Sequence, residues 1–458
     1  MKIWRVLVLT LALSLQVLAQ QENARTAPKP DDRLKADVLL IVAHPDDETG
    51  VSGYLAQLMD QGKRVAAVYL THGEAGHNNM GRERGPSLGA SREMELRHAL
   101  TYLGIENVWF LGGRDTPSQD VLQSLANWHH GQALEDVVRM VRITRPTVIV
   151  SWLPGFFIGE NHGDHQAAGV VASEAFDLAG DPSAFPAQIA QPRHVNETLL
   201  EGLQPWQPQK LYFFSDASDD KQFRGKGPSY PVTGVSPRRH VVYWRLAMDG
   251  FRFHRTQYRS YIEKLDKMTD DQLAKLAGAD QDGWAAPMQF IFGKSIVSES
   301  VTGDIFEGVQ SAPAPYTPPA VAEPIEQTGL SLAIGGPWKF YDDFRRAHGL
   351  NQLPRTEVPE IGIAAGTMLQ IPLILRNQTD RVADVVMEVT LPEGWSQKEK
   401  DLTHRLSAGD VFPFQVELNA PAKKSDNVAE LTFIGTSAGQ TIGTLKIRVR
   451  VGAGGLPQ

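Results

Sequence analysis

The chain of 458 residues contains no cysteine. This absence excludes disulfide bonds and thiolate metal sites, so a bound metal would need histidine and carboxylate ligands. The sequence also lacks an excess of basic residues, and its net charge of −8 argues against nucleic acid and anionic membranes as partners. Past the amino-terminal residues, no apolar run reaches the roughly 20 residues that a membrane-spanning helix needs.

The first residues have the pattern of a secretory signal peptide. Lys2 and Arg5 precede a short apolar run from Val6 to Leu18, and the small residue Ala19 follows. We therefore expect residues 1–19 to be a Sec-type signal, residues 20–34 to be a flexible lead-in, and the mature protein to be periplasmic or extracellular. The alternatives are an uncleaved anchor and a chance apolar start.

Strand-like and helix-like segments alternate from residue 35 onward. Short apolar runs predict buried strands at residues 38–42, 65–70, 108–111, 147–150 and 210–214. Helical spacing of apolar residues separates them, at 51–61, 92–103, 134–143 and 167–175. This rhythm predicts a three-layer α/β/α Rossmann-like sandwich with a mostly parallel sheet over residues 35–310.

The carboxyl-terminal third has a different composition and hydrophobic pattern. We interpret residues 311–356 as a Pro-rich linker and connecting segment. Residues 357–453 contain alternating apolar segments separated by turn residues, which predicts an all-β, immunoglobulin-like sandwich. This domain has no catalytic cluster, and it could bind glycan, pack against the first domain or act as a spacer.

Two clusters of histidine and carboxylate residues follow two of the predicted strands. His44, Asp46 and Asp47 come directly after the strand at 38–42, and His162-Gly163-Asp164-His165 follows the strand at 147–150. Acidic residues before a helix can simply cap it, but that reading leaves the histidines unexplained. Because parallel strands bring such ends to one sheet edge, we expect the clusters to meet there.

The residue types in these clusters suit hydrolysis assisted by a metal. His44, Asp47 and His165 would form a two-histidine, one-carboxylate set, which is suited to a catalytic Zn²⁺. Asp46 could accept a proton from a water molecule, and His162 could polarise a carbonyl or stabilise an oxyanion. Asp164 could orient a metal-binding histidine by a hydrogen bond to its ring, without contacting the metal itself.

Four motifs resemble those of the PIG-L/LmbE-like N-deacetylase family, over about residues 35–257. They are Ala43-His44-Pro45-Asp46-Asp47-Glu48, then Thr71 to Gly76, then Arg92 with Glu95 and Leu96, and finally His162 to His165. The resemblance implies a Zn²⁺-dependent hydrolase that removes an acetyl or other acyl group from the nitrogen of an amino sugar. It gives metal binding to His44, Asp47 and His165, the base role to Asp46, and a place at the tetrahedral intermediate to His162.

The resemblance also indicates residues around the substrate. Glu74 and Arg92 resemble residues that line the sugar site in relatives; their plainer readings are a loop carboxylate and a helix-surface arginine. His254 and Gln257 resemble a late helix of the family, although a structural histidine is an alternative. This chain departs from the family pattern at Gly163, where many relatives have proline, and at Glu160, where mycothiol-pathway relatives carry a carbonyl-polarising tyrosine.

The expected export favours an extracytoplasmic N-acetylated amino sugar or glycan as substrate. Loop aromatic residues such as Trp152, Phe156 and Phe157 could stack on sugar rings. Fe²⁺, Co²⁺ or Mn²⁺ could replace Zn²⁺. A metal-dependent amidase for a non-sugar N-acyl substrate is an alternative, and a catalytically degenerate exported glycan-binding protein is another.

Overall fold

The computed structural model describes residues 30–156, 162–192, 201–217, 220–279, 283–298, 300–319, 328–425 and 427–452. The expected signal peptide, together with Phe157 and Glu160, lies outside these ranges. Within them, no helix has both the length and the apolar character needed to cross a bilayer.

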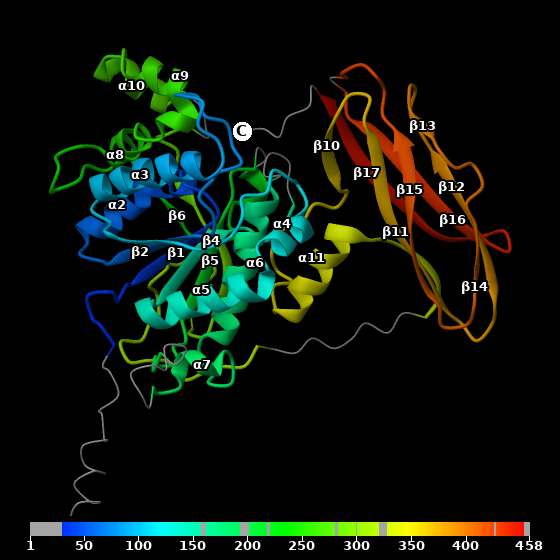
Figure 1. Cartoon of the computed structure of the whole chain (residues 1–458), viewed down its shortest axis with the longest axis horizontal. Coiled ribbons are helices and arrows are strands. Elements are labelled where there is room, and N and C mark those ends of the chain that lie inside the picture. Colours follow the sequence, from blue (N-terminus) through cyan, green and yellow to red (C-terminus); the bar gives the residue numbers. More distant parts are fainter. Residues whose placement is uncertain are drawn as a thin grey trace, which may run out of the picture.

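An α/β domain comes first in the chain (Figure 1). Its described strands are β1 (Val38–Val42), β2 (Val65–Tyr69), β3 (Asn107–Phe110), β4 (Val148–Trp152), β5 (Lys210–Phe214), β6 (Ser229–Tyr230), β7 (Met288–Gln289) and β8 (Ile291–Ser295). Its described helices are α2 (Ser52–Asp60), α3 (Pro86–Leu103), α4 (Val121–Asn127), α5 (His130–Thr144), α6 (Gly163–Leu178), α7 (Pro186–Ile189), α8 (Tyr243–Phe251), α9 (Arg255–Leu265) and α10 (Asp270–Ala277), with 3-10 turns η1 (Asp47–Gly50) and η2 (Asp220–Phe223).

The main sheet has the described strand order β3-β2-β1-β4-β5-β8. The strands β1 to β5 run parallel, and β8 pairs antiparallel with β5 at one edge. Helices α2, α3 and α8 cover one face, and α5 and α6 cover the other (Figure 1). This confirms the predicted three-layer α/β/α arrangement with a mostly parallel sheet.

The strand order determines where a site can form. The chain moves outward from β1 through β2 to β3, and then returns to place β4 on the other side of β1. Val38 pairs with both Val65 of β2 and Val148 of β4, so β1 and β4 end level with each other. Such a switch point opens a crevice at the carboxyl ends of the two strands, where ligands bind in open α/β sheets.

The carboxyl-terminal region is all-β and has its own apolar core. One sheet has the order β10-β17-β16-β12-β14 and the other β13-β15-β11-β9. The bounds are β9 (Gly329–Ile334), β10 (Glu360–Ala364), β11 (Met368–Gln378), β12 (Ala383–Thr390), β13 (Ser396–Gln397), β14 (Thr403–Leu406), β15 (Val411–Asn419), β16 (Ala429–Ser437) and β17 (Gln440–Gly452). Alternate residues of β11 are buried, as expected for a strand with one face on a core.

The segment expected only to connect the domains contributes to both of them. Residues 329–334 form β9, which pairs with β11 in the carboxyl-terminal sheet. Helix α11 (Gly336–Ala347) follows, and Tyr341 and Phe344 of this helix belong to the core of the α/β domain. The chain then returns to the all-β region through β10.

Candidate active site

The turn after β1 is organised by the carboxylate of Asp47. Its Oδ2 accepts hydrogen bonds from the backbone N–H groups of Ala43 (2.8 Å) and His44 (2.9 Å) and from the indole N–H of Trp152 (2.7 Å). These three donors saturate one oxygen and direct the other, Oδ1, toward two histidines. His165 Nε2 lies 3.2 Å from Oδ1 and His44 Nδ1 lies 3.7 Å from it.

Charge around Asp47 keeps it ionised. Burial would raise the pKa of Asp47, but the neighbouring His165 and His44 rings hold it well below its usual value. The buried carboxylate therefore offers a charged oxygen to the space between the two imidazoles.

The first turn of α6 supplies the second cluster. His162 is the N-cap residue, and its Nδ1 accepts the backbone N–H of Asp164 at 3.3 Å. Burial and the nearby His44 and His165 rings lower the pKa of His162 to about 2, so the ring is neutral. Because Nδ1 accepts a hydrogen bond, the ring proton is on Nε2, which can donate.

His165 is held by an aromatic neighbour from β4. Its ring stacks on Trp152 with centroids 4.2 Å apart and planes only 4° from parallel. Trp152 is therefore a buried residue that orients both His165 and Asp47, and it is not the loop platform for sugars that the sequence suggested. Phe156 is buried as well.

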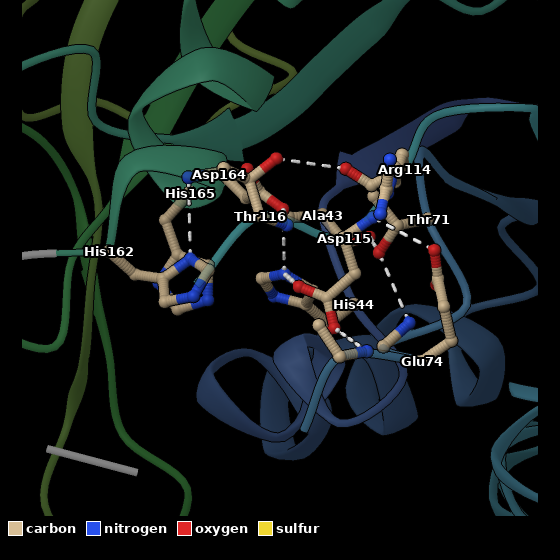
Figure 2. A network of polar contacts seen from close by, with 12 residues as sticks. Ala43, His44, Thr71, Glu74, Arg114, Asp115, Thr116, His162, Asp164 and His165 are labelled. Atoms are coloured by element: carbon tan, nitrogen blue, oxygen red, sulfur yellow. Dashed lines mark hydrogen bonds and ion pairs between the residues drawn. The ribbon is translucent and has the colours of Figure 1, made fainter. Parts of the chain in front are cut away.

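Residues far apart in the sequence thus converge at one point (Figure 2). The His44 ring lies 4.7 Å from the His162 ring and 5.1 Å from the His165 ring, measured between centroids. Each of the three histidines offers a ring nitrogen within 4.8 Å of the others, a group that could hold a metal ion. The switch point between β1 and β4 brings them together.

His44 has a second set of neighbours, one of which the sequence did not identify. Its Nε2 lies 3.3 Å from Asp164 Oδ2 and 3.3 Å from Asp115 Oδ1. Burial would lower the pKa of His44, but these carboxylates, together with Asp47, raise it well above its usual value. The two carboxylates hold the ring at Nε2, and Nδ1 lies on the side of Asp47, 3.7 Å from its Oδ1.

Asp115 follows β3, in a loop that no motif singled out. Its Oδ2 accepts the backbone N–H of Ala75 (2.8 Å), and its own N–H donates to Glu74 Oε1 (3.0 Å). The backbone N–H of Thr116 donates to Asp164 Oδ2 at 2.9 Å. The available signal was Gly112-Gly113-Arg114-Asp115 at the carboxyl end of a predicted strand, where the other site residues also lie.

Asp46 has an unusual backbone and a tyrosine partner. Its φ of 110° lies in the left-handed region, which costs energy for any residue except glycine. The Tyr258 hydroxyl donates to Asp46 Oδ2 at 2.7 Å, and the Asp46 N–H donates to Glu48 Oε2 at 3.1 Å. Burial and the charge of Asp47 raise the pKa of Asp46.

Glu48, the last residue of the first motif, is buried behind Asp46. Its carboxylate lies 2.6 Å from His254 Nε2 and accepts the hydroxyl of Tyr69 at 3.0 Å. Burial opposes a charge on His254, but Glu48 raises the pKa of that ring. Gln257 donates to the carbonyl of Pro45 at 2.9 Å. The late segment that carries His254 and Gln257 is therefore bound directly to the first motif.

Glu74 and Arg92 shape the loop after β2. Arg92 is buried and donates to the carbonyls of Gly73 (2.5 Å) and His77 (3.0 Å). Glu74 accepts the backbone N–H groups of Asp115 and His72. These hydrogen bonds give both residues a structural role, and their contact with a sugar stays a prediction.

Comparison with known proteins gives a consistent result. Residues 39–176 match the family model described as PIG-L: GlcNAc-PI de-N-acetylase. A 1D-myo-inositol 2-acetamido-2-deoxy-alpha-D-glucopyranoside deacetylase of Geodermatophilus obscurus is 35% identical over 165 residues, which are 32% of this chain and 55% of that protein. The match thus spans little more than half the length of that relative.

A longer match comes from Thermobifida fusca. Its protein of the same name is 31% identical over 244 residues, which are 48% of this chain and 82% of that protein. Among solved structures, N,N'-diacetylchitobiose deacetylase from Pyrococcus horikoshii is 20% identical, covers 61% of this chain and 91% of its own, and has a TM-score of 0.39.

The fold and the site define an α/β protein with a histidine–aspartate group, able to hold a metal, at a strand switch point. With these relatives, the chain belongs to the PIG-L family of N-deacetylases.

Proposed function

We propose that this chain is a metal-dependent hydrolase that removes an N-acetyl or other N-acyl group from an amino sugar or N-acetylated glycan. The observation that carries the proposal is the approach of His44 and His165 to the one unsaturated oxygen of Asp47. The His162 ring lies beside this point, 5.1 Å from the His165 ring between centroids, and Asp46 directly precedes Asp47 in the chain.

The geometry of the three candidate ligands fits a small divalent cation. Two ligand atoms bound at about 2.0–2.2 Å to one tetrahedral ion lie roughly 3.3–3.6 Å apart. The distances from Asp47 Oδ1 to His165 Nε2 (3.2 Å) and to His44 Nδ1 (3.7 Å) are close to this range. His44, Asp47 and His165 would hold the ion, with Zn²⁺ as the expected metal and Fe²⁺, Co²⁺ or Mn²⁺ as substitutes.

His162 is better suited to the substrate than to the metal. The N-cap hydrogen bond from Asp164 occupies the lone pair on Nδ1, so the proton is on Nε2. A protonated nitrogen cannot bind a metal ion, but it can donate a hydrogen bond to the carbonyl oxygen of an amide. We therefore assign His162 to the oxygen that becomes negative when water attacks.

Asp46 is suited to move the proton. The Tyr258 hydroxyl bonds to Oδ2, which leaves Oδ1 of Asp46 to accept a proton from the attacking water. A cation held there would polarise the amide and lower the pKa of that water. Asp46 would take a proton from the water as its oxygen attacks the carbonyl carbon, and would return it to the nitrogen as the C–N bond breaks. The products are a carboxylate and an amine.

The substrate class rests on two supports. The curated relatives are named as deacetylases of a 2-acetamido-2-deoxy-glucopyranoside, which is an N-acetylated amino sugar. The expected signal peptide would place the reaction outside the cytoplasm, which favours an extracytoplasmic N-acetylated glycan. The all-β region would then be an immunoglobulin-like accessory domain.

The test is turnover by the Zn²⁺-loaded full chain on N-acetylglucosamine and its oligomers, compared with N-acetyl amino acids. Asp46→Asn keeps the shape and tolerates the positive φ, but it removes the base. We expect it to lower kcat by about 10²–10⁴-fold while the metal content stays unchanged. His165→Ala should lose the metal as well.

Asp271→Asn is the matched control, because it makes the same chemical change at an exposed position of α10 and should keep full activity. Hydrolysis of N-acetyl amino acids alone would favour the non-sugar amidase. A protein that binds no metal and cleaves neither class would refute the enzymatic proposal.

A further inference from the structure

Helix α11 joins two strands of the all-β region, yet it packs on the catalytic domain (Figure 1). Tyr341 and Phe344 of α11, with Leu350 and Leu353 just after it, are buried in the same apolar core as β1 and β4. Since β9 precedes the helix and β10 follows it, the carboxyl-terminal region is attached to the α/β domain through this helix.

The first contact of α11 is with the helix that carries the second histidine cluster. The Tyr341 hydroxyl donates to Gln166 Oε1, and both side chains are buried. Gln166 follows His165 in the first turn of α6. Among the described residues, Gln166 Nε2 has no hydrogen-bond partner. The hydrogen bond from Tyr341 to Oε1 is therefore the one that this buried side-chain amide makes with them.

A second contact fixes the last turn of α6. Asp177 is buried and accepts hydrogen bonds from His348 Nδ1 (2.7 Å) and from Lys294 Nζ of β8 (2.6 Å). Gln352 donates to the carbonyl of Gly293 in the same strand, at 2.5 Å. The segment from Tyr341 to Gln352 therefore holds α6 at both of its ends.

A third set of contacts reaches the loops around the site. The Thr356 hydroxyl donates to the carbonyl of Phe156, at the start of the stretch that leads to His162 (2.9 Å). Gln119 donates to the carbonyl of Gly362 in β10 (3.3 Å). The neighbouring Ser118 accepts the backbone N–H of Gly163, the first residue of α6 (2.7 Å).

These contacts matter because the position of α6 sets the separation between His165 and Asp47. Metal coordination tolerates only about ±0.2 Å in its bond lengths, so a small shift of the first turn would disturb the site. Without the Tyr341 hydroxyl, Gln166 Oε1 would also lack a partner. A buried polar group without a partner is costly, so its loss would favour a shift of the first turn of α6.

We infer that Tyr341 is a positioning residue: through Gln166 it holds the first turn of α6 so that His165 reaches the metal position. Through this helix, the carboxyl-terminal region helps to position the metal ligand His165 of the α/β domain. This inference rests on the proposed function, because it assumes that His165 binds a metal.

The test uses the full chain, loaded with Co²⁺, whose visible absorption reports the number and geometry of its ligands. We expect Tyr341→Phe to weaken Co²⁺ binding by about tenfold or more, as loss of a supporting residue does elsewhere, and to change the absorption band. Tyr243→Phe is the matched control: it removes a comparable hydroxyl, which donates to Asp60 at 3.0 Å, from helix α8. It should leave both readouts unchanged.

A second variant tests whether Tyr341 acts through Gln166. If Tyr341 acts through Gln166, then Tyr341→Phe should make no further difference to Co²⁺ binding in a Gln166→Leu background. Wild-type affinity and spectrum in Tyr341→Phe would overturn the inference, as would an equal loss in the two backgrounds. A wild-type chain that binds no Co²⁺ would instead refute the metal site, and the inference with it.

Discussion

The carboxylate of Asp46 accepts a hydrogen bond from a hydroxyl that lies far along the chain of the α/β domain. Tyr258 Oη lies 2.7 Å from Asp46 Oδ2, across 212 residues of chain. Tyr258 itself leaves helical geometry, with φ −127° and ψ 31°, in the middle of α9. This local break directs the phenol toward Asp46, the proposed base, whose own backbone lies in the left-handed region.

Removing that hydroxyl should slow the chemical step. A hydrogen bond to a charged group contributes about 1.5–3 kcal/mol, which corresponds to roughly 10–100-fold in rate. We expect Tyr258→Phe to lower kcat by about this factor with little change in KM or metal content, measured by steady-state kinetics and metal analysis. Tyr261→Phe, which changes a second tyrosine of α9, is the control. An unchanged kcat would show that Tyr258 does not support the base.

Helix α6 is the element on which the site depends most. Gly169 allows this helix to lie directly on the end of β4, because a Cβ there would be 2.2 Å from the carbonyl oxygen of Trp152 and 2.8 Å from Pro154 N. Gly163 has a similar role, since its Cβ would lie 2.7 Å from Ser124 Oγ and 2.9 Å from the Asp120 carbonyl oxygen at the start of α4. The glycine where many relatives have proline therefore fits the close packing of α4.

Gly169→Ala should separate α6 from β4. Alanine favours a helix by about 1 kcal/mol, but the clash is with backbone atoms that cannot rotate away, and overpacking costs about 1–3 kcal/mol. We expect a net loss of unfolding free energy in urea, together with weaker metal binding. Gly131→Ala in α5, where a Cβ meets no atom within 4 Å, should be neutral or stabilising. Equal effects of the two variants would contradict this argument.

The contact between α5 and α6 should make stability depend on pH. His130 Nε2 lies 2.6 Å from Glu174 Oε2, and this hydrogen bond raises the pKa of His130 above its usual 6.5 despite partial burial. A raised pKa in the folded state means that the stabilisation is complete below the unfolded pKa and is lost as the pH rises through the folded value.

We expect the difference in unfolding free energy between the wild type and His130→Gln to be larger at about pH 5.5 than at about pH 8.5. Because the pair is partly exposed, the change should not exceed about 1 kcal/mol. Urea titrations at both pH values measure it. The same difference at both values would mean that the ion pair contributes nothing.

At the scale of the whole molecule, the two apolar cores have different buried residues, but Ile361 packs against both, and the chain that joins them contributes to both regions. Leu350 is fully buried in the first core, although it lies beyond β9 of the carboxyl-terminal sheet. Leu418 of β15 is equally buried in the second core. A destabilising substitution in the segment after α11 should therefore also destabilise the α/β domain.

Leu350→Ala should cost about 2–5 kcal/mol, the usual price of a cavity in a packed core. We expect it to lower the urea concentration at which bound Co²⁺ is released by more than Leu418→Ala does, because only Leu350 packs in the core that carries the site. Absorption of Co²⁺ during unfolding measures this release. If Leu418→Ala had the larger effect, the two regions would be coupled in some other way.

The sequence by itself determined the elements whose pattern is local. Continuous apolar runs predicted β1, β2, β4 and β5, because a strand buried on both faces has apolar residues at successive positions. Alternation predicted the long strands of the all-β region, because a strand buried on one face has apolar residues at every second position. The motif residues around His44 and His165 were also identifiable, since His44 directly follows β1 and His162 and His165 lie in the connection between β4 and α6.

Only the tertiary structure decided the partners that these residues have. The sequence did not identify Asp115, Tyr258 or Tyr341 as partners of the site, because their contacts with His44, Asp46 and Gln166 depend on strand order and helix docking. Helix α11 was not predicted, although Trp338, Tyr341 and Phe344 recur at helical spacing in its sequence. The spacing indicates an apolar face, but only the docking of the helix decides that this face packs beside α4 and α6.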